Sequence, residues 1–162
     1  MRWIWIDKFV EFESGVRAVA IKNVSLAEEH LHDHWAAYPV MPASLMVEGM
    51  AQTAGILVGE ARDFKEKVIL AKVKRARFSR EVRPGEQLRY DATIEQVSHE
   101  AASTVGRVFA DGVEIGQVDI VFSHIDNNLS GLQFPEENFV FTDDFKSLLR
   151  TYNVSRGASC KA

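Results

Sequence analysis

Hydrophobic and polar residues alternate along much of this chain, which is the spacing typical of β-strands. The clearest example is residues 87–97, QLRYDATIEQV, in which apolar side chains occupy every second position from Leu88 to Ile94. Further segments with the texture of strands are residues 3–12, 16–24, 68–78 and 113–122. Turn signals separate the strands at Ser14-Gly15, Pro84-Gly85, Ser98-His99 and Asp111-Gly112. The pattern predicts an antiparallel sheet of several strands.

Residues 42–58, PASLMVEGMAQTAGILV, interrupt this alternation with a run that is too long for a typical buried strand. Its Leu, Met and Ala content predicts a helix, which Pro42 can begin because its missing N–H has no partner in a first turn. Glu48 is the one charged residue of the run, so we expect a buried helix. Close packing against this helix is indicated by Gly49, Gly55 and Gly59. The sequence therefore predicts an α+β fold in which the sheet wraps against one long helix.

Residues 125–162 differ from the rest of the chain in their pattern of hydrophobic and polar residues. A turn or linker is indicated at residues 126–128, Asp-Asn-Asn. Thr142 is placed to cap a short helix in which Phe145, Leu148 and Leu149 share a face. We expect a first domain over residues 1–125 and a partly ordered C-terminal extension over residues 126–162.

The composition fits one folded domain with an appendage, since the chain has 162 residues, is 46% hydrophobic and carries a formal net charge of -4. That charge argues against sequence-independent binding of nucleic acid. No apolar run approaches the roughly 20 residues needed to cross a bilayer, and acidic residues come too early for a signal peptide. The single cysteine, Cys160, suits a reducing compartment. We expect a cytoplasmic protein that engages neither nucleic acid nor membrane.

Glu48 is the most informative residue, because an isolated carboxylate in a buried helix is costly. Its neighbours three and four positions away include no cation. Ser44, Glu48 and Gln52 lie four apart and would form a narrow polar stripe on an apolar helix. Burial disfavours the charged form of a carboxyl group, which makes Glu48 a candidate proton donor. The alternative is a structural carboxylate that a lysine, an arginine or a backbone amide from elsewhere satisfies.

Three histidines, His30, His32 and His34, alternate just before the helix in EEHLHDHWAAYP. Clustered histidines can bind zinc, but adjacent His32 and Asp33 do not fit the His-x-His-x-Asp-His pattern of the metallo-β-lactamase-like hydrolases. Two other interpretations are open: exposed loop histidines without a role, or a neutral histidine set against a protonated glutamate as an acid/base pair. We expect no metal site.

The residues from His34 to Gln52, HWAAYPVMPASLMVEGMAQ, closely resemble a motif of the β-hydroxyacyl-(acyl carrier protein) dehydratases of hot-dog fold. That motif runs His-Phe-Pro-Gly-x-Pro-Val-Met-Pro-Gly and then Leu-x-x-Glu-Ala-x-Ala-Gln, and the spacing from His34 to Glu48 matches without a gap. The resemblance extends to the strand at residues 17–25 and to KVKRARFSREVRPGEQL at residues 72–88. It covers about residues 3–124.

The resemblance implies a hot-dog domain that needs no cofactor and forms a homodimer, or a trimer of dimers, with active sites at the subunit interface. The implied reaction is reversible loss of water from a (3R)-hydroxyacyl thioester to give the trans-2-enoyl thioester, in fatty-acid or related acyl-chain synthesis. The thioester would be carried on acyl carrier protein or on coenzyme A. In the family pattern, His34 of one subunit abstracts the α-proton and Glu48 of its partner protonates the departing hydroxyl.

Three further residues are candidates for substrate binding. The N–H of Ala43 follows Pro42 at the positive end of the helix dipole, where it could polarise the thioester carbonyl and stabilise an enolate. Gln52 shares the polar stripe and the motif of Glu48. We expect the helix and the strand around Phe78 to supply the apolar lining for an acyl chain.

The sequence departs from the family motif at three places. Trp35-Ala36-Ala37 replaces Phe-Pro-Gly after the histidine, Ala43 replaces a glycine, and Gly49 stands where alanine is usual. Because both proton-transfer candidates are kept, catalysis is the leading hypothesis. The extension at 126–162 has three possible interpretations. It could cover the mouth of the tunnel that binds the acyl chain, it could pack against the partner subunit of the dimer, or it could be dispensable.

Basic residues crowd the segment after the helix, at Lys72, Lys74, Arg75, Arg77, Arg80 and Arg83. Because residues two apart on a strand share a face, we expect Lys72 and Lys74 on one side and Arg75 and Arg77 on the other. These charges could dock an acidic carrier protein. They could also protect a solvated strand edge from aggregation.

Three hypotheses follow from different classes of protein: a dehydratase, a hot-dog thioesterase with a carboxylate-activated water, and a non-catalytic subunit that binds acyl thioesters. Incubation with 3-hydroxyacyl and enoyl thioesters separates them. Loss or addition of water indicates the first, release of free thiol the second, and neither reaction the third.

Overall fold

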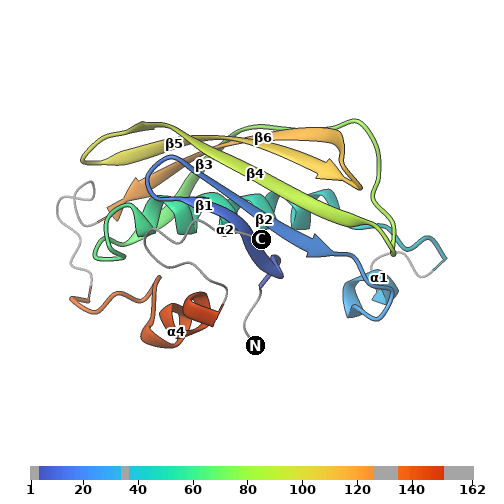
Figure 1. The fold of residues 1–162 in the computed structure, drawn as a ribbon, viewed down its shortest axis with the longest axis horizontal. Helices are drawn as coiled ribbons and strands as arrows, with labels where there is room; N and C mark the ends of the chain where they lie inside the picture. Colours follow the sequence, from blue (N-terminus) through green and yellow to red (C-terminus); the bar gives the residue numbers. More distant parts are fainter. Residues whose placement is uncertain (1–3, 34–36, 126–134, 152–162) are drawn as a thin grey trace.

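The computed structural model describes residues 4–33, 37–125 and 135–151. The strands are β1 (Lys8–Glu13), β2 (Arg17–Asn23), β3 (Val68–Phe78), β4 (Gln87–Val97), β5 (Ala101–Ala110) and β6 (Val113–His124). The helices are α1 (Glu29–Asp33), α2 (Ala43–Glu60) and α4 (Asp143–Thr151). The strands form one six-stranded antiparallel sheet in the order β1-β2-β4-β5-β6-β3, which curves over α2 (Figure 1). The predicted α+β architecture, with a sheet wrapped against one long helix, is confirmed.

Helix α2 begins directly after Pro42 and ends at Glu60, two residues beyond the predicted end. Most of its side chains are buried against the sheet, as the nearly continuous apolar sequence indicates. Within the described ranges, no helix combines the length and the apolar character that a bilayer span requires.

The sheet approaches α2 closely because α2 presents glycines to aromatic rings. A Cβ atom on Gly49 would lie 2.5 Å from Cζ of Tyr90, and one on Gly55 would lie 3.2 Å from Cε1 of Phe122. The predicted close packing at these positions is confirmed. Tyr90 is fully buried, and burial raises the pKa of its hydroxyl, so the ring packs behind α2 as a neutral phenol. The replacement of the family's usual alanine by Gly49 thus has a steric reason in this chain.

Strand β4 spans the same residues as the predicted strand at 87–97. Its alternation places Leu88, Tyr90 and Ala92 in the core with no exposed surface, while Arg89 and Asp91 lie on the other face. Asp91 there receives two hydrogen bonds of 2.8 Å from the Arg17 guanidinium of β2. The predicted bounds of this strand and the predicted burial of its apolar face are both confirmed.

Strand β3 is an edge of the sheet, and its register against β6 shifts after Leu70 and again after Val73. Each shift inserts one extra residue into β3, which is a β-bulge. As a result, Lys72, Arg75 and Arg77 pair with Val121, Asp119 and Gln117, which alternate along β6 and so share one face. The expectation that Lys72 lies on the side opposite Arg75 and Arg77 is wrong, because simple alternation holds only without bulges.

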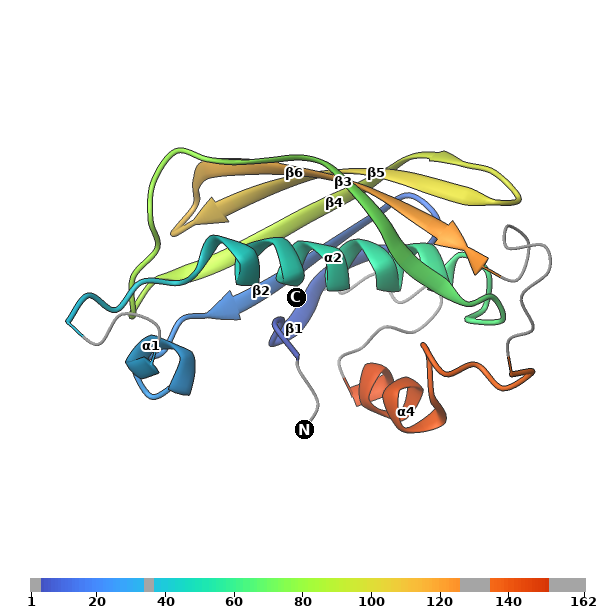
Figure 2. The ribbon, with the colours of Figure 1, turned by 180° about the vertical axis from the view of Figure 1, so that it is seen from behind.

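Two short helices, α1 and α4, lie near opposite ends of the sheet (Figure 1). Helix α1, a single turn at Glu29–Asp33, lies in the histidine-rich stretch before α2, for which no element is predicted from the sequence. Thr142 caps α4 as predicted, since its Oγ1 accepts a hydrogen bond of 3.3 Å from the N–H of Phe145. Figure 2 shows α4 near the C-terminal end of α2, on the side away from the sheet.

The contact between Gly49 and Tyr90 predicts that Gly49→Ala destabilises the protein. In an open helix this substitution stabilises by about 1 kcal/mol. Here the new methyl group meets the Tyr90 ring, and overpacking of a core costs about 1–3 kcal/mol. We therefore expect a net decrease in the free energy of unfolding, measured by urea denaturation.

The matched control is the same substitution in a Tyr90→Leu background, where the ring is absent. There Gly49→Ala should be neutral or stabilising relative to Tyr90→Leu alone. An equal loss of stability in both backgrounds would contradict the steric explanation.

Candidate active site

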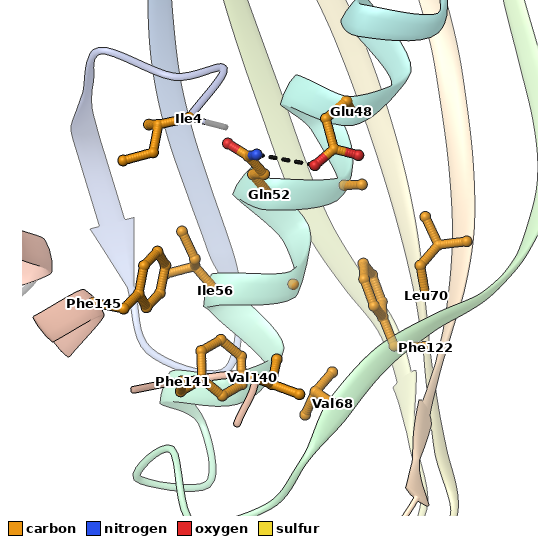
Figure 3. A pocket seen from close by; sticks show the side chains of 12 residues that line it. Ile4, Glu48, Gln52, Ile56, Val68, Leu70, Phe122, Val140, Phe141 and Phe145 are labelled. Atoms are coloured by element: carbon orange, nitrogen blue, oxygen red, sulfur yellow. Dashed lines mark hydrogen bonds between the residues drawn. The ribbon is translucent and has the colours of Figure 1, made fainter. Parts of the chain in front are cut away.

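Glu48 lies half-buried on α2, one helical turn before Gln52. The side-chain NH₂ of Gln52 donates a hydrogen bond of 2.9 Å to Glu48 Oε1 (Figure 3). The carbonyl oxygen of Gln52 in turn accepts a hydrogen bond of 2.8 Å from the main-chain N–H of Trp5. Because an N–H can only donate, the bond from Trp5 fixes which end of the Gln52 amide faces Glu48. The N-terminal segment thereby orients the candidate acid.

No lysine, arginine or histidine in the described ranges forms an ion pair with Glu48. Its partner there is the neutral amide of Gln52, which leaves the carboxyl group without a compensating charge. Ser44, the third residue of the predicted stripe, is exposed at the start of α2. The arrangement differs from that of a structural carboxylate neutralised by a distant cation.

A pocket of about 310 Å³ extends along α2 from Glu48 and Gln52. Figure 3 shows these two polar side chains at one end and apolar side chains along the rest. The apolar lining comes from α2, β3, β6, the N-terminal segment and the segment before and within α4: Ile4, Ala51, Gly55, Ile56, Val68, Leu70, Phe122, Val140, Phe141 and Phe145. A carboxyl group at the polar end of an apolar pocket can act on a polar group at the head of a hydrocarbon chain.

Ala43 and Phe78 lie together in a second hollow of about 370 Å³, at the other end of α2. Ala43 is exposed at the first position of the helix, where an amide N–H has no acceptor within the helix. Within one chain, therefore, the predicted substrate-binding residues form two sets, with Gln52 beside Glu48 and Phe78 beside Ala43. His34 and the altered residues Trp35 and Ala36 lie outside the described residues.

The remaining histidines of the upstream cluster have different environments. The ring of His30 packs edge-on against Trp5, with the ring centroids 5.0 Å apart, and His32 is exposed on α1. Across residues 4–33, 37–125 and 135–151, no three His, Cys, Asp or Glu side chains are grouped so that they could hold a metal ion.

Sequence reasoning missed two contributions to this site. Trp5 acts through its main-chain N–H, a group that every residue except proline has, so its sequence carries no signal of this role. Phe141 and Phe145 belong to FVFTDDF, whose aromatic residues were a visible signal of burial but did not indicate which cavity they line.

Residues 3–119 match the model of the FabA-like domain. The chain belongs to the FabA-like domain family. It is 34% identical over 122 residues to a 3-hydroxyacyl-(acyl carrier protein) dehydratase FabZ of Bacillus pumilus, a match that covers 75% of this chain and 85% of the relative. It is 38% identical over 112 residues to the dehydratase of the same name from Caldanaerobacter subterraneus, covering 68% of this chain and 75% of the relative.

Solved structures support the fold of this FabA-like domain. The dehydratase heterocomplex ApeI:P from Xenorhabdus doucetiae matches with a TM-score of 0.61 and 14% identity, over 75% of this chain and 82% of that one. The phenylacetic acid degradation protein PaaI from Thermus thermophilus matches with a TM-score of 0.57 and 17% identity, over 72% and 91%. The FabA-like domain has the hot-dog fold, as the resemblance of its motif implies. The matched residues end within β6, so Val140, Phe141 and Phe145 lie beyond them.

The bond between Trp5 and Gln52 predicts a local effect of Gln52→Ala. Loss of a hydrogen bond with a net value of about 1 kcal/mol should accelerate exchange of the Trp5 amide hydrogen at least about fivefold. Hydrogen–deuterium exchange followed by NMR measures this rate. The amide of Asp7, which donates to the carbonyl of Ile21 at 2.7 Å, is the internal control and should be unaffected. Unchanged exchange at Trp5 would contradict the assigned contact.

Proposed function

We propose that this protein is a dehydratase, a hydro-lyase that removes water from (3R)-hydroxyacyl thioesters in fatty-acid or related acyl-chain synthesis. The observation that carries the proposal is Glu48, held by the neutral amide of Gln52 at the polar end of an apolar pocket. The dehydratase names of relatives at 34% and 38% identity support the same activity. We place the reaction in the cytoplasm, which the single cysteine, Cys160, suits.

The reaction requires a base at the α-carbon and an acid at the β-hydroxyl. His34 takes the α-proton, and the electron pair of that C–H bond forms the α,β double bond as the C–O bond breaks. Glu48 gives its proton to the departing hydroxyl, so the products are one water and one trans-2-enoyl thioester. The N–H of Ala43 donates to the thioester oxygen while negative charge develops there. Gln52 positions Glu48 through the hydrogen bond described above.

The working unit in this proposal is a homodimer formed along β3. This edge strand has 11 residues, and Ile69, Leu70 and Val73 on it are 37%, 42% and 38% exposed. A long edge with exposed apolar side chains is a ready template for pairing with another strand. A two-fold axis at this edge would bring the pocket of Glu48 in one subunit toward the Ala43 and Phe78 hollow of the other. Further assembly into a trimer of dimers is compatible with this contact.

The proposal predicts that His34→Ala and Glu48→Gln each reduce dehydration at least about 100-fold, because general acid–base catalysis contributes about 10²–10⁴-fold. Activity is followed as formation of the enoyl thioester from a 3-hydroxyacyl thioester. Circular dichroism and gel filtration show whether each variant keeps the fold and oligomeric state of the parent. Release of free thiol in place of water loss would favour the thioesterase hypothesis.

Mixing the two inactive variants tests whether the site is shared between subunits. A heterodimer of His34→Ala with Glu48→Gln has one site with both groups intact and one with neither. Random exchange of subunits makes half of the dimers mixed, so the expected recovery is about a quarter of the activity of the parent. No recovery after confirmed exchange would contradict a site built from two subunits.

We further propose that an acyl carrier protein delivers the thioester to the outer face of β3. Lys72 and Arg77 are exposed there, and neither forms an ion pair within the described part of the chain. Arg75 on the same face is 3.4 Å from Asp119 and is partly neutralised. Two unpaired cations on an exposed strand face can attract an acidic carrier and accelerate encounter.

The double substitution Lys72→Glu/Arg77→Glu tests carrier docking. We expect KM for the carrier-bound substrate to rise about tenfold, with little change for the same acyl group on coenzyme A. Lys65→Glu is the control, because Lys65 is a highly exposed lysine outside β3. Equal effects on both substrates would overturn the assignment of a docking face.

A further inference from the structure

We propose that the segment at residues 135–151 closes the far end of the Glu48 pocket and thereby sets the longest acyl chain that the enzyme accepts. The inference rests on the proposed function and names a specificity determinant for it. The segment lies beyond the residues that match the FabA-like domain. It nevertheless supplies Val140, Phe141 and Phe145 to the wall of the pocket, at the end opposite Glu48 (Figure 3).

Phe141 packs against α2 at a position where a glycine leaves room for its ring. Its side chain is only 4% exposed, and a Cβ atom on Gly59 would lie 2.5 Å from Phe141 Cζ. Its ring also packs edge-on against Phe64, with the centroids 5.0 Å apart. Phe64 has a positive φ of 54°, a backbone conformation that is strained for a non-glycine residue. The close packing of Phe141 against Gly59 and against the strained residue Phe64 indicates that its side chain has one specific position.

Asn138 makes four side-chain hydrogen bonds, of which two tie the segment to the turn after α2 and two lie within the segment. Its side-chain NH₂ donates to the carbonyl oxygens of Phe64 at 3.0 Å and Glu66 at 3.2 Å. Its Oδ1 accepts from the N–H groups of Val140 at 3.0 Å and Phe141 at 2.9 Å. One amide thus fixes the segment in register, so that Val140 and Phe141 reach the pocket together.

Helix α4 adds the last part of this wall. Thr142 caps it, and Phe145 lies half-buried with its ring centroid 6.0 Å from that of Phe141. Leu149, one turn further along the same face, is buried. The aromatic side chain of Phe145 therefore points into the pocket from a helix that is itself anchored to the domain.

The length of the pocket gives the expected limit. Glu48 and Ile56, which line its two ends on α2, are eight positions apart, or about 12 Å along a helix. An extended hydrocarbon chain advances roughly 1.3 Å per carbon, given C–C bonds of about 1.5 Å. The pocket therefore accommodates roughly eight to ten carbons beyond the reacting centre before the chain meets Phe141 and Phe145.

The experiment compares the full-length enzyme with Phe145→Ala and Phe145→Trp on 3-hydroxyacyl thioesters of 4, 8, 12 and 16 carbons. For Phe145→Ala, we expect the ratio of kcat/KM on the 16-carbon substrate to kcat/KM on the 4-carbon substrate to rise at least tenfold. For Phe145→Trp, we expect the ratios of kcat/KM on the 8- and 12-carbon substrates to kcat/KM on the 4-carbon substrate to fall. Phe139→Ala is the matched control, because Phe139 is 49% exposed in the same segment and does not line the pocket.

Binding distinguishes failure of this inference from failure of the proposed function. Saturated acyl-coenzyme A thioesters of the same lengths have no hydroxyl to lose, and isothermal titration calorimetry measures their affinity. If no variant dehydrates any substrate, but Phe145→Ala still shifts binding toward longer chains, the chain-length limit holds and the dehydratase assignment fails. If the 4-carbon substrate reacts, but neither substitution at Phe145 changes the chain-length profile in activity or in binding, the limit is overturned.

Discussion

Burying a carboxyl group inside an apolar helix costs free energy unless another group replaces the lost water. In this protein the replacement is partial, since Glu48 receives the Gln52 amide and no cation in the described residues. The rest of the site follows from this constraint, because a group that is held but not neutralised can exchange a proton with a ligand. A hydrogen bond from the main-chain N–H of Trp5 in turn holds the side chain of Gln52 on α2.

The close approach between α2 and its surroundings depends on small residues. Gly49 admits the Tyr90 ring from the sheet, and Gly59 admits the Phe141 ring from the C-terminal segment. In both contacts an aromatic ring packs directly against the helix backbone, but the two contacts lie at different positions along α2. The first supports α2 beside Glu48, and the second closes the apolar end of the pocket. In the proposed enzyme, the contacts that stabilise the fold and those that limit the acyl chain therefore lie along the same helix.

The exposed edge at β3 connects the fold to the proposed chemistry. Two bulges keep Leu70, Val73 and Ala76 opposite the buried β6 residues Phe122, Ile120 and Val118, and they gather basic side chains on the other face. The strand thus has an apolar face toward the α2 layer and a charged face toward the outside. In the proposed dimer, this strand joins the two subunits and receives the carrier on its outer side.

The sequence by itself determined the architecture and the identity of the candidate acid. The long apolar run with a single carboxylate predicted α2 and Glu48, and the clean alternation predicted β4, because both signals arise from local periodicity. The motif from His34 to Gln52 pointed to the family that the comparisons with known proteins then showed.

Three features were decided by the tertiary structure alone. They are the face of the sheet on which each β3 side chain lies, the contact of Trp5 with Gln52, and the position of the segment at residues 135–151. A bulge is set by pairing with a neighbouring strand and a main-chain N–H carries no side-chain signal, so neither is encoded in local pattern. The separation of Gln52 from Phe78 and the seat of Phe141 on Gly59 join residues far apart in the chain. Such contacts depend on how elements pack, which periodicity along the sequence does not specify.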